Sequence, residues 1–298
     1  FTANQIVTVS QLQVNVKASN GLQISADAQS WKTILEKADL DKAGTAYNVL
    51  INQLPEDNLE PVSTTGNVST GKMDMFYGVA AANDADGGNF YISSTKETDT
   101  TGKTGKYIAF DLFLKVDQDT TVYLSSNSKV TINGDTDLGL QNAARVAFVK
   151  EGTLTADKDP GSMRELALAT GTADIWEPNY DTHTAKGVAA ARDTYGVTTT
   201  TTNGAKIPYF GIKDIIPVNT VPMKQSTTTN PNETYFDSVT TKWHTAAANS
   251  TNFEFGKLTA GVTKIRVYMW VEGQDVDCEN SASGATINFD LQFTTNNG

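Results

Sequence analysis

The chain has 298 residues, of which 39% are hydrophobic and 19% charged, and its formal net charge is −11. This length allows one large β domain or two smaller ones. The negative charge argues against partners that need a basic protein surface, such as nucleic acid or anionic membranes, and no apolar run is long enough to span a bilayer. The Thr-rich, Arg-poor composition indicates a secreted β protein.

The N-terminal 25 residues predict strands. Their apolar positions change parity between Val9 and Leu12, which indicates a β-bulge near Ser10. The apolar residues of the first run are Ile6, Val7, Val9, Leu12, Val14 and Val16.

A helix is predicted next, over residues 27–43. Trp31, Ile34 and Leu35 would share one helical face, and Gly44 follows as a stop signal.

Short strands separated by polar turns then follow up to residue 149. The clearest is 107–116, where every second residue from Ile108 to Val116 is apolar. Further strands are predicted over 73–81, 89–94, 122–124, 130–132 and 145–149. Strands at this spacing are typical of a sandwich or a jelly roll.

Residues 150–250 show little alternation and many threonines. Ser162 and Glu165 have the spacing of a capping box, and residues 185–194 predict one or two helical turns. We interpret this span as long loop excursions from the sandwich and not as a separate domain.

Two regular strands are predicted near the end of the chain. Residues 264–271 alternate, but the residues on both faces are large, so both faces should be partly covered. Residues 286–293 alternate between apolar and polar side chains, which predicts a strand with one buried face.

The histidine pattern does not support catalysis. The chain has only two, His183 and His244, and neither belongs to an HExxH zinc motif. No nucleophile elbow or phosphate-binding glycine loop is present. We therefore expect no enzymatic activity and no catalytic residues.

Carboxylate-rich turns raise the question of calcium. They contain Asp84 and Asp86, Asp135 and Asp137, and Asp275, Asp277 and Glu279. Two or three oxygens form only part of a calcium shell, which has six to eight, so a solvated charged turn is the expected structure. We expect no cofactor and no metal site, with calcium left open. Cys278 is expected to be an inert loop thiol, because neighbouring carboxylates raise a thiol's pKa.

Both ends of the sequence resemble a known family. The run Phe1–Gln5 with Leu12–Val14, the segment Lys264–Cys278 and the closing run Ile287–Phe293 are similar to the TasA/camelysin group of exported Gram-positive proteins. The resemblance implies a jelly-roll sandwich that polymerises into extracellular fibres when an N-terminal strand completes the sheet of the next subunit. Camelysin has been classed as a metalloprotease, but the usual zinc ligands are missing here.

The resulting fold prediction is an all-β, jelly-roll-like antiparallel sandwich with long loop excursions and one or two short helices. Residues 1–18 would form a donor strand and residues 19–298 the sandwich, including the 150–250 insertion. The expected function is a structural subunit of a cell-surface or extracellular filament, exported with a cleaved signal peptide. Its partner would be a second copy, added head to tail.

The predicted donor-strand anchors are Ile6, Val7, Val9, Leu12, Val14 and Val16. The same strand pairing within its own subunit remains an alternative. Another alternative is a monomeric jelly-roll module that binds glycans or a surface through Trp176, Tyr180 or Trp243.

Overall fold

The computed structural model describes residues 1, 6–17, 21–45, 50–83, 89–134, 137–193, 200–218, 220–222, 232–248, 251–279 and 284–296. Strands account for 47% and helices for 9% of the structure, which confirms the predicted all-β, sandwich-like fold. No helix within these ranges is long and apolar enough to cross a membrane.

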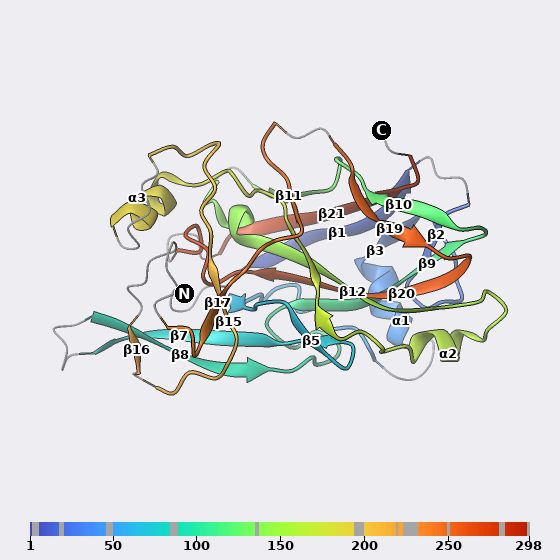
Figure 1. The fold of residues 1–298 in the computed structure, drawn as a ribbon, viewed down its shortest axis with the longest axis horizontal. Helices are drawn as coiled ribbons and strands as arrows, with labels where there is room; N and C mark the ends of the chain where they lie inside the picture. The colour runs from blue at the N-terminus through green and yellow to red at the C-terminus, as the bar shows by residue number, and fades with distance from the viewer. Residues whose placement is uncertain are drawn as a thin grey trace.

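Two six-stranded sheets form the sandwich (Figure 1). We call the first the terminal sheet, because it contains the first and last strands, and the second the central sheet. The terminal sheet consists of β1 (Thr8–Lys17), β3 (Ile34–Glu36), β10 (Thr120–Leu124), β11 (Lys129–Ile132), β19 (Phe253–Leu258) and β21 (Thr286–Thr294). The central sheet consists of β2 (Gln23–Ser25), β9 (Ile108–Val116), β12 (Ala144–Leu154), β14 (Asp174–Glu177), β18 (Trp243–His244) and β20 (Gly261–Val271).

Pairs of strands cross together from one sheet to the other, as in a jelly roll. β9 pairs with β20 in the central sheet, and the strands that continue them on the far side, β10 and β19, pair in the terminal sheet. In the same way, β12 pairs with β20 while β11 pairs with β21. These paired crossings connect both sheets through one double ribbon.

A third layer covers the outer face of the central sheet. It consists of β4 (Val62–Ser63), β5 (Asn67–Ser69), β6 (Lys72–Met73), β7 (Met75–Asn83), β8 (Asn89–Glu97), β13 (Gly171–Thr172), β15 (Phe210–Ile212), β16 (Val221–Pro222) and β17 (Phe236–Ser238). The 150–250 span supplies part of this layer, but its β14 and β18 extend the central sheet. The span is therefore partly built into the sandwich and is not only a loop excursion.

The layers enclose two apolar cores. The larger core lies between the terminal and central sheets, and the second lies between the central sheet and the outer layer. All eleven residues of β20 are buried, which confirms that both faces of this strand are covered. β21 alternates between buried and partly buried residues, as its sequence predicts.

The predicted helix over 27–43 is wrong at its start. Helix α1 spans Lys37–Thr45. The Asp27 carboxylate instead accepts hydrogen bonds from the backbone N–H of Gln29 and Ser30, which closes a local turn. Residues 34–36 then form β3, because they pair with β1. This tertiary pairing overrides the local helical periodicity.

Among the described residues, three other short helices lie outside the sheets: the 3₁₀ helix η2 (Leu140–Ala143), α2 (Pro160–Arg164) and α3 (Ala185–Asp193). Helix α3 confirms the predicted turns. Helix α2 begins three residues before the predicted capping box: Asp159 is its N-cap and accepts from the Ser162 N–H, and Pro160 occupies the first helical turn.

Candidate functional site

The first strand and the last strand lie side by side in the terminal sheet (Figure 1). β1 pairs with β21 in parallel, from Thr8 opposite Thr286 to Lys17 opposite Thr294. The register shifts between Val9 and Gln11, which confirms the bulge predicted near Ser10. Within the described part of the terminal sheet this is the one parallel pair. A parallel pair of this length is unusual in a sheet whose other described pairs are antiparallel.

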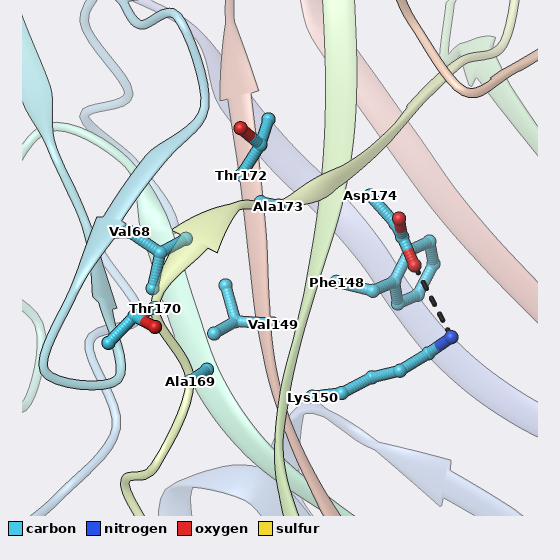
Figure 2. Close-up of a pocket in the computed structure, with 9 residues that line it drawn as sticks. All are labelled: Val68, Phe148, Val149, Lys150, Ala169, Thr170, Thr172, Ala173 and Asp174. Carbon is cyan, nitrogen blue, oxygen red and sulfur yellow. Dashed lines mark ion pairs between the residues drawn. The ribbon is translucent and has the colours of Figure 1, made fainter.

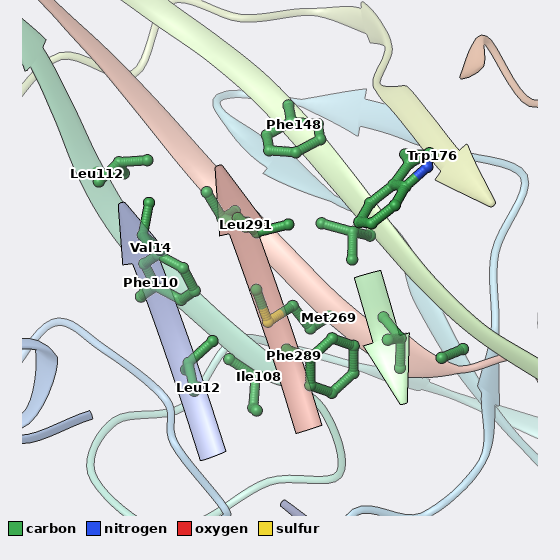
Figure 3. Close-up of a cluster of buried hydrophobic side chains, with 14 of the residues drawn as sticks. Leu12, Val14, Ile108, Phe110, Leu112, Phe148, Trp176, Met269, Phe289 and Leu291 are labelled. Atoms are coloured by element: carbon green, nitrogen blue, oxygen red, sulfur yellow. The ribbon is translucent and has the colours of Figure 1, made fainter. Parts of the chain in front are cut away.

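The predicted anchor residues of β1 mostly face the larger core. Figure 3 shows Leu12 and Val14 beside Phe289 and Leu291, with side chains of β9 in the same interior. Val7, Val9, Leu12 and Val14 are at most 2% exposed. Val16 is partly buried and packs against the core. Ile6 is 46% exposed, so it is not an anchor in this structure, contrary to the sequence prediction.

A row of polar side chains fixes the register on the other face of β1. The Asn15 amide donates to Asp290 at 3.1 Å, and the Gln292 amide donates to the Asn15 side-chain oxygen at 2.8 Å. The Asn133 amide donates to Ser10 Oγ at 2.9 Å. These contacts join β1 to β21 and to the segment after β11.

The opposite edge of β1 has much less support. Its antiparallel partner β3 has three residues, which face Gln13, Val14 and Asn15. Before the strand, Val7 exchanges two backbone hydrogen bonds with Leu59, each 2.9 Å long. β1 therefore fills a groove between the full length of β21 and a short, interrupted second wall.

The sequence alone does not show which strand pairs with β1. Alternation identifies both β1 and β21 as half-buried strands, but period two carries no information about which strand pairs with which. The sequence predicts a helix at Leu35, which is 1% exposed and lies in the short strand β3. The opposite-face pairs, such as Asn15 with Gln292, could have suggested a partner, since polar residues that face each other across a pair form side-chain bonds.

A buried ionic network joins the start of β12, the end of β14 and the turn after β20. Arg145, fully buried, makes ion pairs with Glu177 at 2.7 Å and with Asp275 at 2.6 Å. Asp275 and Asp277 are 8% and 1% exposed. The structure thus contradicts the expected solvated turn here, because these carboxylates are partners of buried cations.

His183 uses both ring nitrogens in this network. Its Nδ1 lies 2.8 Å from the Asp277 carboxylate, and its Nε2 lies 2.7 Å from the Ala205 carbonyl oxygen. A carbonyl oxygen only accepts, so Nε2 carries a hydrogen. Burial lowers the pKa of His183, but the hydrogen bond to Asp277, the nearby charges of Asp275 and Asp277 and the bond to the Ala205 carbonyl together raise it overall. This arrangement leaves no free imidazole nitrogen on His183 to accept a proton from a nucleophile.

Of the carboxylates in the other acidic turns, the structure describes Asp137. Within the described ranges, no group of three or more His, Cys, Asp or Glu side chains is arranged to hold a metal ion. Asp137 accepts from the Gly139 N–H and the Gln141 amide. Asp84, Asp86 and Asp135 lie outside the described residues.

Cys278 is buried at 3% exposure, and burial raises the pKa of its thiol to about 12. The thiolate form that reacts is therefore disfavoured at neutral pH, as the sequence predicts.

The aromatic residues considered for glycan stacking are not presented to solvent. Trp176 and Trp243 are 1% and 6% exposed and belong to the larger core. Tyr180 is partly buried, and its ring centroid lies 4.2 Å from that of His244.

A small pocket lies where the outer layer meets β12 (Figure 2). Its volume is about 170 Å³, and an ion pair of 3.3 Å between Lys150 and Asp174 lies on one side. Ligand pockets usually measure roughly 300–1,000 Å³, so this space is too small for a typical organic ligand. The lining residues are Val68, Phe148, Val149, Lys150, Ala169, Thr170, Thr172, Ala173 and Asp174.

Comparisons with known proteins give no relative. A scan against protein-family models, a search of curated proteins and a search of solved structures each found no match to this chain. The candidate functional site is the groove between β21 and β3 that β1 fills.

Proposed function

We propose that this protein is a structural subunit of an extracellular or cell-surface filament, and that it polymerises by donating β1 to the sheet of the next subunit. The observation that carries the proposal is the parallel pairing of β1 with β21, in a groove whose other wall is the three-residue strand β3. β1 takes no part in the paired crossings between the sheets, so it can leave without breaking the double ribbon of the jelly roll.

The energetics of the groove favour an obligatory occupant. A fully buried Val or Leu side chain contributes roughly 1.5–3 kcal/mol, so Val7, Val9, Leu12 and Val14 together contribute on the order of 6–12 kcal/mol. This is comparable to the whole stability of a domain, roughly 5–15 kcal/mol. A subunit with an empty groove would therefore unfold or bind a strand from another chain.

An identical strand from a neighbour would make the same contacts in the groove. Exchange of β1 between subunits is then nearly neutral in the groove itself, and any added contact between subunits drives it toward assembly. When each subunit gives β1 to one neighbour and receives β1 from another, the contact is head to tail, and it produces a filament if the rotation between subunits does not close a ring. Main-chain hydrogen bonds along β21 supply affinity, and the buried side chains supply specificity.

Two features of the sequence support the extracellular setting. The Thr-rich composition with a net charge of −11 is typical of a secreted β protein, and both ends of the chain resemble the TasA/camelysin proteins. We propose on the same grounds that the protein has a structural and not an enzymatic role.

Electron microscopy of the purified chain beside a variant that lacks residues 1–18 tests the proposal. Fibres from the full chain and none from the truncated variant are expected. A synthetic peptide of residues 1–17, added to the variant during refolding, should restore its folded near-UV circular dichroism without restoring fibres, because the peptide does not link subunits. Monomers from the full chain at high concentration would overturn the proposal and favour a monomeric module.

A further inference from the structure

A narrow aromatic slot lies in the outer layer, away from the groove of β1. The ring of Phe1 occupies it, and the residue is 7% exposed. Two glycines, Gly78 and Gly273, lie against opposite edges of the ring. A Cβ added to Gly273 would lie 2.1 Å from Cε1 of Phe1, and a Cβ added to Gly78 would lie 2.7 Å from its Cδ2. The ring therefore lies against bare backbone, where any larger residue than glycine would collide with it.

Large apolar side chains complete the slot. They come from β7, β8, β15, β16, β17 and the segment after β15, and they form a cluster separate from both cores of the sandwich. The members besides Phe1 are Phe76, Ile92, Ile212, Ile216, Val221 and Phe236. These apolar side chains suit a flat aromatic ring.

Contacts that do not involve Phe1 hold the slot in shape. The Gly273 N–H donates to the Val62 carbonyl at 2.9 Å, which fixes the loop after β20 beside β4. The Ile212 N–H donates to Ser63 Oγ at 3.0 Å, and the Ile216 N–H donates to Ser94 Oγ at 2.9 Å. The walls are therefore positioned by their own hydrogen bonds, as a preformed binding site requires.

We infer that this slot is the recognition pocket for the donated segment, and that in the filament it holds Phe1 of the neighbouring subunit. The inference rests on the proposed strand donation and deepens it. Phe1 and Val7 are six residues apart, a reach of at most about 20 Å. A subunit that accepts β1 in its groove therefore also has its slot within reach of Phe1 of the same donated segment.

The slot gives the donated segment a second contact besides the pairing of β1 with β21. This second contact fixes the register of the segment. A strand can slip by two residues and still point the same side chains inward, because side chains alternate with period two. A ring that fits only between Gly78 and Gly273 blocks such a slip. The slot thus selects segments that carry an aromatic side chain at the right distance from β1.

Mixing two variants tests the inference. Phe1→Ala has an intact slot but a poor donor, whereas Gly273→Ala has an intact donor but a slot that cannot hold the ring. Each variant alone should elongate at least about 100-fold more slowly than the parent, because truncating or displacing a buried aromatic anchor is among the largest single losses. Mixed together, they should form 1:1 dimers that stop growing, measured by light scattering and native mass spectrometry.

Matched controls separate folding from assembly. Phe90→Ala removes a ring that is 59% exposed, and Gly161→Ala adds a Cβ that meets the Asp159 carboxylate at 3.0 Å; both should elongate like the parent. Circular dichroism checks that each variant is folded, and Gly78→Ala replaces Gly273→Ala if the latter is not. Parent fibres together with normal elongation of Phe1→Ala, or with a mixture that stays monomeric, would overturn the inference alone. Absence of fibres from the parent and both controls would overturn strand donation as well.

Discussion

Asn15 of β1 and Gln292 of β21 face each other across the parallel pair, and the Gln292 amide donates to the Asn15 side-chain oxygen at 2.8 Å. The two residues are 277 positions apart in the sequence. The pair thus ties the two ends of the chain together and marks the register in which the groove accepts β1. On the other face of β1, the buried side chains supply the free energy that stabilises the strand in the groove.

Truncation of a buried β1 anchor should lower stability strongly. Leu12→Ala removes a side chain that is 2% exposed, and we expect the free energy of unfolding to fall by about 2–5 kcal/mol. Gln11→Ala, at the neighbouring exposed position, should change it by less than about 0.5 kcal/mol. Urea unfolding followed by tryptophan fluorescence measures both. Equal effects of the two substitutions would show that β1 does not lie in the core.

Removal of Arg145 should destabilise the protein through its two buried partners. Arg145→Met leaves the carboxylates of Glu177 and Asp275 without their cation, and breaking a buried ion pair in this way costs about 3–5 kcal/mol. Arg192→Met is the control, since the Arg192 side chain is 51% exposed and pairs with Asp193 on the surface. A loss below about 1 kcal/mol for Arg145→Met in thermal unfolding would contradict the buried network.

The carboxyl group of Glu151 predicts a pH dependence. The residue is 1% exposed, and among the described residues neither carboxyl oxygen has a hydrogen-bond partner. Burial raises the pKa of Glu151 to about 7, although Lys264 opposes the effect. The folded state therefore binds this proton more tightly than the unfolded state, so its stabilising contribution is complete below about pH 4.5 and is lost as pH rises to about 7.

Glu151→Gln removes this titration. We expect the variant to match the parent near pH 4 and to exceed its stability by about 1–3 kcal/mol at pH 8. Glu165→Gln, at an exposed position, should leave the pH profile of the parent unchanged. The profiles come from urea unfolding across this range. A parent stability that rises between pH 5 and pH 8, with the same rise in Glu151→Gln, would rule out the assignment.

Cys278 should resist thiol reagents in the folded protein. Its burial and raised pKa predict labelling by a disulfide reagent at least about 100-fold slower than for an exposed thiol. The comparison variant carries Cys278→Ser with Ala156→Cys, which places one thiol at an exposed turn position. In denaturant both proteins should react equally fast. Rapid labelling of native Cys278, or fibres that a reductant dissolves, would contradict an inert thiol.

The sequence predicts strands well where burial imposes a period. β9, β20 and β21 follow their apolar patterns, because each has at least one face against the core. The period fails at residues 27–43, where β1 recruits residues 34–36 as a strand. That pairing is a long-range contact, and no local pattern encodes it.

The site was predictable only in part. Four of the six expected anchors are buried, three of them in β1 and Val7 just before it, since alternation defines a buried face. The parallel partner β21, the short wall β3 and the slot at Gly78 and Gly273 depend on segments brought together from distant parts of the chain. Asp275 and Asp277 also look like a polar turn in sequence, because their partners Arg145 and His183 lie about 90–130 residues away.

The most direct test of strand donation is a covalent record of which subunit β1 occupies. Asn15→Cys with Gln292→Cys, in a Cys278→Ser background, places two cysteines opposite each other across β1 and β21, within reach of a disulfide. Fibres of this variant are oxidised, dissolved in denaturant and separated by non-reducing electrophoresis. Strand donation predicts a ladder of covalent multimers that collapses to monomer after reduction. Fibres that yield only disulfide-closed monomers would show that β1 stays in its own subunit and would contradict the account.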